Sequence, residues 1–133
     1  MDDRIDNIDP IVLHWRESSD ENYATMQNLL KANEFSWSLF LGHLVIEKLL
    51  KALYVKKLQR HPIFSHDLLR LVKKIEIELP SDYDEWLDEI TTFNLNTRYD
   101  NYKQGFNKLC TVEFSNEWII KIEILRKWLI SQL

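Results

Sequence analysis

Charged residues inside an apolar stretch are the first candidates for chemistry. The segment 35–58 reads FSWSLFLGHLVIEKLLKALYVKKL, and the charged residues near its centre are Glu47, Lys48 and Lys51. In a helix, Glu47 and Lys51 lie one turn apart in the favourable order, acid before base. Charges surrounded by apolar side chains need a charged partner or water. Two interpretations stay open: an ordinary ion pair on a narrow wet face, or part of a ligand-binding site.

A second group of candidates, Arg98, Tyr99 and Tyr102, lies in the segment RYDNYKQGF. An arginine guanidinium can hold a phosphate with two parallel hydrogen bonds, and tyrosines add an aromatic face and a hydroxyl. The segment 94–106 has turn formers and little apolar periodicity, which predicts a loop or an irregular helix start. Functional groups are frequent on such segments. The alternative is that Arg98 pairs with a buried acid, for which Glu47 is the candidate, and only holds the loop.

His66 and Asp67 form a third pair, at the start of a predicted helix. Asp67 favours the positive end of the helix dipole, and His66 is expected to hydrogen-bond a neighbouring group, so both are predicted to be structural. No metal or cofactor site is expected, because the four histidines lack companions at ligand spacing and both glycines are isolated. Cys110 is predicted to be a small buried apolar residue.

Helices must position all of these residues, because only two Gly and three Pro interrupt the 133-residue chain. The expected fold is one all-α domain over 1–133, an up-and-down bundle of about five helices. The predicted helices begin near 8–11 and end before 33, then cover 35–58, about 65–79, about 81–93, and about 115–133. The predicted N-caps are Asp9, Ser65 and Ser81.

The net charge is only -4, but the charges are segregated. The segment 48–74 holds eight Lys or Arg and one acid, whereas 76–89 holds seven acids and no base. This distribution either steers an anionic ligand to one side of the molecule or keeps the surface soluble. The lone cysteine and the acidic start MDDRIDNID predict a cytoplasmic protein, and the charges in the middle of 35–58 argue against a membrane span.

The order of three motifs resembles the HEPN domain family, from about Trp15 to the end. The motifs are LGHLVIEKLLKALYVKK, HPIFSHDLLRLVKKI and NTRYDNY. In this family a glutamate-lysine pair and a further lysine lie on a long second helix, a His-Asp-Leu triplet opens the next helix, and an arginine-tyrosine pair follows. The resemblance implies a set of ligand-binding residues, namely Glu47, Lys48, Lys51, Arg98, Tyr99 and Tyr102.

The resemblance also shapes the expected activity. HEPN nucleases carry a histidine four to six residues after the motif arginine, but Tyr102 stands four residues after Arg98 here. A phenol, with an ordinary pKa of about 10, is a poor base at neutral pH, so an active ribonuclease is not expected. The resemblance implies instead a domain that binds a nucleotide or RNA beside a small nucleotidyltransferase, in a toxin-antitoxin-like pair. A metal-independent ribonuclease and a non-catalytic assembly subunit are the alternatives.

A homodimer is expected as well. The segment 118–130 carries more apolar side chains than one helix of a small bundle normally buries, which suggests a contact with another chain. The family that the sequence resembles also dimerises through helix faces.

Overall fold

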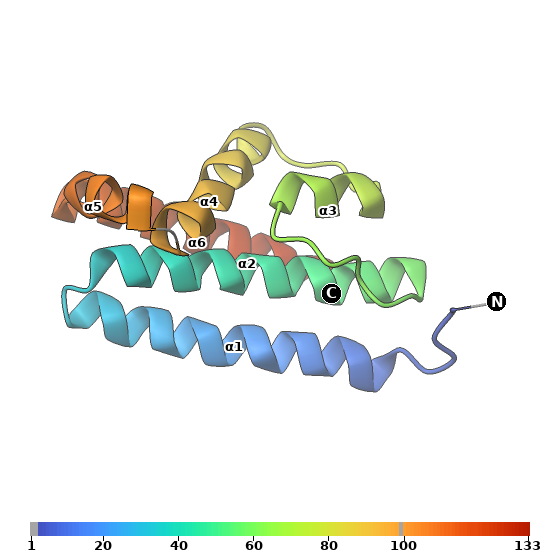
Figure 1. The fold of residues 1–133 in the computed structure, drawn as a ribbon. Helices are drawn as coiled ribbons and strands as arrows, with labels where there is room; N and C mark the ends of the chain where they lie inside the picture. Colours follow the sequence, from blue (N-terminus) through green and yellow to red (C-terminus); the bar gives the residue numbers. More distant parts are fainter. Residues whose placement is uncertain (1–2, 99) are drawn as a thin grey trace.

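The computed structural model describes the backbone of residues 3–98 and 100–133 and the side chains of residues 3–97 and 103–133. It is an all-α bundle, as predicted (Figure 1). The helices in the described part are α1 (Asp9–Lys31), α2 (Phe35–Leu58), α3 (Leu68–Ile75), α4 (Tyr83–Arg98), α5 (Asp100–Leu109) and α6 (Val112–Gln132). Among these residues, no helix combines the length and the apolar character that a membrane span requires.

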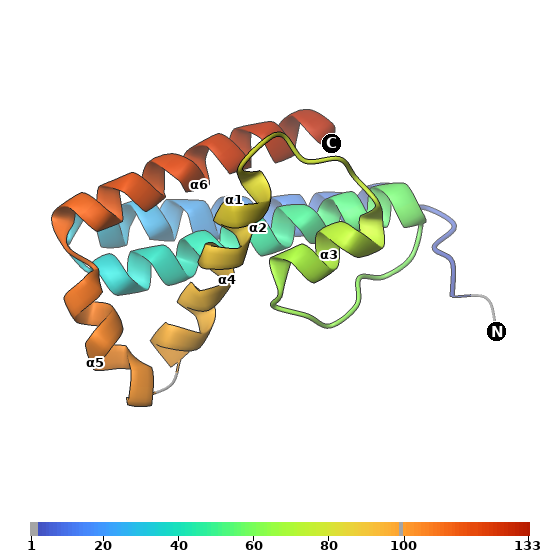
Figure 2. The ribbon, with the colours of Figure 1, turned by 90° about the horizontal axis from the view of Figure 1, so that it is seen from above.

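The centre of the bundle is α2, with the bounds that the sequence predicts. It packs against α1, α3, α4 and α6. Figure 2 shows α6 along one side of α2 and α4 crossing above it, while α1 lies beneath in Figure 1. Most side chains between 38 and 55 are therefore buried, which explains why this segment is apolar almost all the way round.

Small residues let α1 approach α2 closely. Ser19 is buried and donates from Oγ to the Val45 carbonyl at 2.9 Å. A Cβ atom at Gly42 would stand only 2.5 Å from Cδ1 of Ile122, so a larger residue where α1, α2 and α6 meet would force the Ile122 side chain to move. These contacts fix the register of α2, and with it the positions of its central charges.

Of the two predictions for 94–106, a loop or an irregular helix start, the loop was wrong, because α4 continues to Arg98 and α5 begins at Asp100. Buried positions in this region include polar as well as aromatic side chains. Asn94 and Thr97 are buried beside Phe93, whose ring lies 5.5 Å from that of Phe106. Because two inward-facing side chains are polar, the apolar periodicity that signals a helix is interrupted although the helix is not.

Several predicted helix ends also need correction. Asp67, not Ser65, is the N-cap of α3 and accepts from the Arg70 amide at 3.3 Å, while Ser65 Oγ accepts from the Asp67 amide at 3.1 Å. A left-handed residue, Glu76, ends α3 at φ 61°, before the predicted Leu79.

The remaining helix starts shift by a few residues. Asp9 is the first residue of α1 and not its cap, α4 begins two residues after the predicted cap Ser81, and α6 begins at Val112. Thr111 caps α6 by accepting from the Phe114 amide at 3.2 Å. Each cap depends on which side-chain oxygen reaches a free amide, and spacing alone does not determine this.

Candidate functional site

A buried carboxylate on α2 organises the strongest candidate site. The side chain of Glu47 is 4% exposed, and each of its oxygens has its own donor. Oε2 accepts from Lys51 Nζ at 3.1 Å, and Oε1 lies 2.8 Å from His66 Nδ1. Because a carboxylate only accepts, Nδ1 of His66 must carry the hydrogen. The second ring nitrogen, Nε2, is then left to meet solvent or a ligand, and the His66 side chain is 36% exposed.

His43, one turn before Glu47 on α2, holds the backbone of His66. Its Nε2 donates to the His66 carbonyl at 2.9 Å and lies 3.8 Å from Glu47 Oε1. Burial is the main cause that lowers the pKa of His43, and it outweighs the hydrogen bond to the His66 carbonyl and the Glu47 charge, which act in the opposite direction. A neutral His43 donates through one nitrogen only. Two α2 side chains therefore fix both the ring and the carbonyl of His66.

Aromatic rings surround the Lys51 ammonium. It lies 5.3 Å from the centre of the Trp15 ring, on α1, and 6.0 Å from that of Phe64, in the α2–α3 connection. Both distances suit a cation–π contact. Phe64 also meets the His66 ring edge to face, with the centroids 5.6 Å apart, although 88% of Phe64 is exposed. We call Trp15, Glu47, Lys51, Phe64 and His66 the Glu47 cluster.

The structure thus refines the two interpretations of the α2 charges, the ordinary ion pair and the ligand-binding site. The predicted Glu47–Lys51 pair forms, but it is buried and does not lie on a wet face. Lys48 turns toward α1 instead and donates to Ser18 Oγ at 2.7 Å. Partial burial lowers the pKa of Lys48, against the opposing charges of Glu47 and Glu21.

Two other predicted ligand residues, Arg98 and Tyr102, lie where α4 ends and α5 begins, which we call the α4–α5 corner. Arg98 is the last residue of α4 and Tyr102 belongs to α5, but their side chains and all of Tyr99 lie outside the described residues. Both oxygens of Glu47 already have donors. The alternative Arg98–Glu47 pair stays a prediction, because the Arg98 side chain lies outside the described residues.

Two side chains near the end of α4, close to this corner, are both polar and buried. Oδ1 of Asn94 and Oγ1 of Thr97 have no hydrogen-bond partner among the residues that the structure describes. Lys103 Nζ lies 5.2 Å from the centre of the Trp37 ring, which is 38% exposed. A cation and an aromatic ring are therefore present here too.

Sequence reasoning missed Trp15 and Phe64 as members of the site. Trp15 fits the apolar stripe of α1, so periodicity gives no sign of its contact with a cation. Phe64 did leave a signal, because it stands in HPIFSH, a connection between helices where it belongs to no helical stripe. His66 and Asp67 are predicted to be structural; in the structure His66 hydrogen-bonds Glu47 and Asp67 caps α3.

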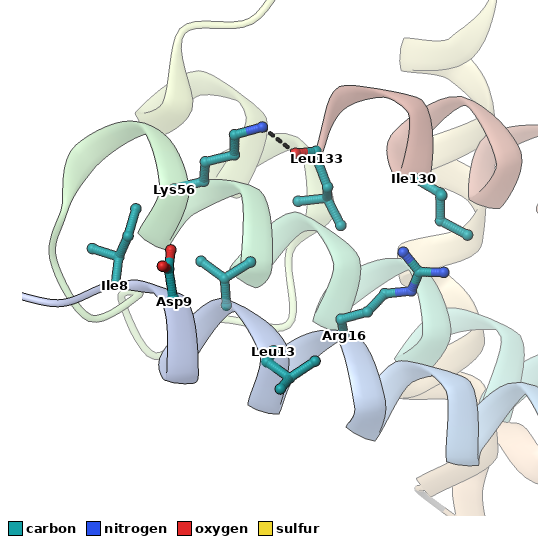
Figure 3. A pocket seen from close by; sticks show the side chains of 8 residues that line it. Ile8, Asp9, Leu13, Arg16, Lys56, Ile130 and Leu133 are labelled. Atoms are coloured by element: carbon teal, nitrogen blue, oxygen red, sulfur yellow. Dashed lines mark hydrogen bonds between the residues drawn. The ribbon is translucent and has the colours of Figure 1, made fainter.

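A separate pocket of about 410 Å³ lies between the start of α1 and the ends of α2 and α6 (Figure 3). It is lined by Ile8, Asp9, Val12, Leu13, Arg16, Lys56, Ile130 and Leu133. The Lys56 side chain reaches from α2 toward the end of the chain and donates to the Leu133 carbonyl. None of these lining residues belongs to the Glu47 cluster. Its walls are mainly apolar, and its two cationic residues, Lys56 and Arg16, bind the Leu133 carbonyl and Asp20.

Two other kinds of chemistry find little support in the described part of the chain. No group of three or more His, Cys, Asp or Glu in these residues is arranged to hold a metal ion. Cys110 is buried as predicted, and burial raises the pKa of its thiol to about 11, which keeps it protonated and unreactive at neutral pH.

Comparison with known proteins identifies a family and a fold. The sequence profile of the HEPN domain family matches residues 12–133. The crystal structure of TT1696 from Thermus thermophilus superposes with a TM-score of 0.78, at 18% sequence identity, over 92% of this chain and 98% of that chain. At this identity the likeness concerns the fold alone. No curated protein sequence matches the chain.

Proposed function

Because the chain belongs to the HEPN domain family, we propose that it binds a nucleotide or an RNA. The Glu47 cluster is the observation that carries this proposal. A buried carboxylate there holds a lysine ammonium and a partly exposed imidazole beside an exposed aromatic ring. Cations and donors of this kind take phosphate oxygens, and aromatic rings take bases.

Arg98 is proposed as the main phosphate ligand of the same site. The α2–α3 connection and the C-terminal end of α4 lie on the same side of α2 in Figure 2. A hydrogen bond of 3.2 Å from the Leu68 amide to Thr91 Oγ1 ties the start of α3 to α4. This arrangement supports a site that extends from the Glu47 cluster to the corner where Arg98, Tyr99 and Tyr102 stand in the sequence.

Replacing Arg98 with alanine should weaken binding of AMP about 10- to 150-fold, the equivalent of losing hydrogen bonds to a charged group worth about 1.5–3 kcal/mol. Isothermal titration calorimetry measures this change directly. Arg70→Ala is the matched control, because Arg70 is exposed on α3. Equal affinity in the Arg98→Ala and unmodified proteins would remove Arg98 from the site, and absence of AMP and RNA binding by the unmodified protein would contradict the proposed function.

A small nucleotidyltransferase is the proposed partner, in a toxin-antitoxin-like pair in the cytoplasm. The arginine-tyrosine motif in NTRYDNY supports this partner through its resemblance to that branch of the family. Affinity purification of the tagged chain from its native cells tests it. Recovery of a nucleotidyltransferase with the unmodified chain is expected, whereas a chain recovered only with copies of itself would favour an assembly subunit.

We also propose that the protein is a homodimer, and α6 supplies the supporting surface. Val112, Ile120 and Ile124 are 52%, 60% and 41% exposed, and Ile120 and Ile124 lie one turn apart on one face. Ile120→Glu combined with Ile124→Glu should convert the dimer to a monomer at micromolar concentration in light scattering. Leu13→Glu, at an exposed position on α1, serves as the control. A monomeric unmodified protein would contradict this prediction.

A further inference from the structure

We propose that Phe64 and His66 recognise the base of the bound nucleotide, with Phe64 stacking on the base and Lys51 attracting its phosphate. This inference rests on the proposed function and adds to it a subsite outside the arginine-tyrosine motif. The connection that carries both residues runs from the end of α2 to the start of α3.

The exposure of Phe64 is the first observation behind this proposal. Phenylalanine is among the most frequently buried residues, yet 88% of Phe64 is accessible. Its neighbours hold the backbone in place, because Ile63 packs against the core and Ser65 is buried. The connection is thus anchored on both sides of Phe64 and presents its ring to solvent.

Polar groups beside the ring are the second observation. Nδ1 of His66 is committed to Glu47 at 2.8 Å, so the contact leaves Nε2 to donate to or accept from a ligand. The Lys51 ammonium has three N–H donors, and its hydrogen bond to Glu47 uses one of them. Hydrogen-bonding capacity therefore remains within a few ångströms of an exposed aromatic face.

This combination favours a nucleotide over an apolar protein partner. A protein that covered Phe64 with apolar side chains would also have to take the partly exposed His66 imidazole out of water, which costs free energy. A nucleotide instead offers a π-face for the ring and an anionic phosphate for the cations. The basic character of the segment 48–74 adds a field that attracts such a ligand.

Calorimetric titration of AMP and of ribose 5-phosphate into four proteins tests this inference. Phe64→Ala should weaken AMP binding about 5- to 150-fold, the range expected for loss of base stacking. Phe64→Tyr keeps the aromatic face and should bind AMP like the unmodified protein. Leu13→Ala, which removes an exposed apolar side chain on α1, is the matched control. Ribose 5-phosphate lacks the base, so its affinity should be the same in all four proteins.

The outcomes separate this inference from the proposed function. If AMP binds equally well to the unmodified protein and to Phe64→Ala, the base subsite is wrong while nucleotide binding stands. If neither AMP nor ribose 5-phosphate binds the unmodified protein, the subsite fails, and if RNA does not bind either, the proposed function fails with it. A change in oligomeric state on Phe64→Ala with unchanged AMP affinity would assign Phe64 to a protein contact and overturn the base subsite.

Discussion

Replacing Tyr102 with histidine is expected to raise metal-independent cleavage of single-stranded RNA about 10²- to 10⁴-fold, the usual contribution of a general acid or base. The unmodified protein should cleave slowly or not at all. A guanidinium such as that of Arg98 is able to bind phosphate and stabilise developing charge, but the residue four positions later is a tyrosine, and a phenol with an ordinary pKa of about 10 is a poor base at neutral pH. Histidine at that position supplies the missing proton-transfer group.

The assay uses purified protein, a labelled single-stranded RNA and EDTA, so that cleavage does not depend on added metal. The double variant Arg98→Ala with Tyr102→His should lose the gained activity, which shows that the cleavage comes from this site and not from a contaminating nuclease. Tyr102→Phe controls for loss of the hydroxyl. Rapid cleavage by the unmodified protein that disappears in Arg98→Ala would contradict this prediction and favour an active ribonuclease.

Glu47→Ala is expected to lower the free energy of unfolding by about 3–5 kcal/mol. The substitution leaves the buried Lys51 ammonium without its carboxylate partner and removes the acceptor of His66 Nδ1. It also releases the ring that holds the α2–α3 connection against α2. Urea unfolding followed by circular dichroism at 222 nm measures the loss.

A charge-free pair provides the matched control for Glu47→Ala. Glu47→Leu combined with Lys51→Met removes both charges and keeps similar side-chain volume, so it should lose only the hydrogen bond to His66 and be clearly more stable than Glu47→Ala. Such a protein should nevertheless bind AMP more weakly, because Lys51 is part of the proposed site. A loss below about 1 kcal/mol in Glu47→Ala would mean that the pair behaves like a solvent-exposed one.

Contacts at His66 join two separate sequence motifs of this chain, LGHLVIEKLLKALYVKK and HPIFSHDLLRLVKKI. His43 and Glu47, from the first motif, bind the carbonyl and the ring of His66, from the second. The two residues that follow then start the next helix, because Asp67 caps α3 and Leu68 is completely buried. The glutamate-lysine pair and the His-Asp-Leu triplet therefore form one hydrogen-bonded unit.

The sequence predicted the fold well where the buried side chains of a helix are nearly all apolar. The bounds of α2 follow from an apolar surface all round and a turn at Asn33, whose φ is 61°. The α4–α5 corner was not predictable in the same way, because Asn94 and Thr97 are buried polar residues and local periodicity cannot show what surrounds them.

The candidate site was predictable in part. The spacing of Glu47 and Lys51 predicted their ion pair, but not its burial, which arises because α1 and the α2–α3 connection place Trp15 and Phe64 near Lys51. The partner of His66 could not be named from sequence either, since residues 19 positions apart meet only through the path of that connection.

Titration of the ¹⁵N-labelled protein with AMP, followed by amide chemical shifts, tests most directly where a nucleotide binds. The largest shifts should fall on residues of the Glu47 cluster, including Lys51, Phe64 and His66, and on the α4–α5 corner around Arg98. Shifts confined to the pocket of Figure 3, around Val12 and Ile130, or no shifts at millimolar AMP, would contradict this expectation.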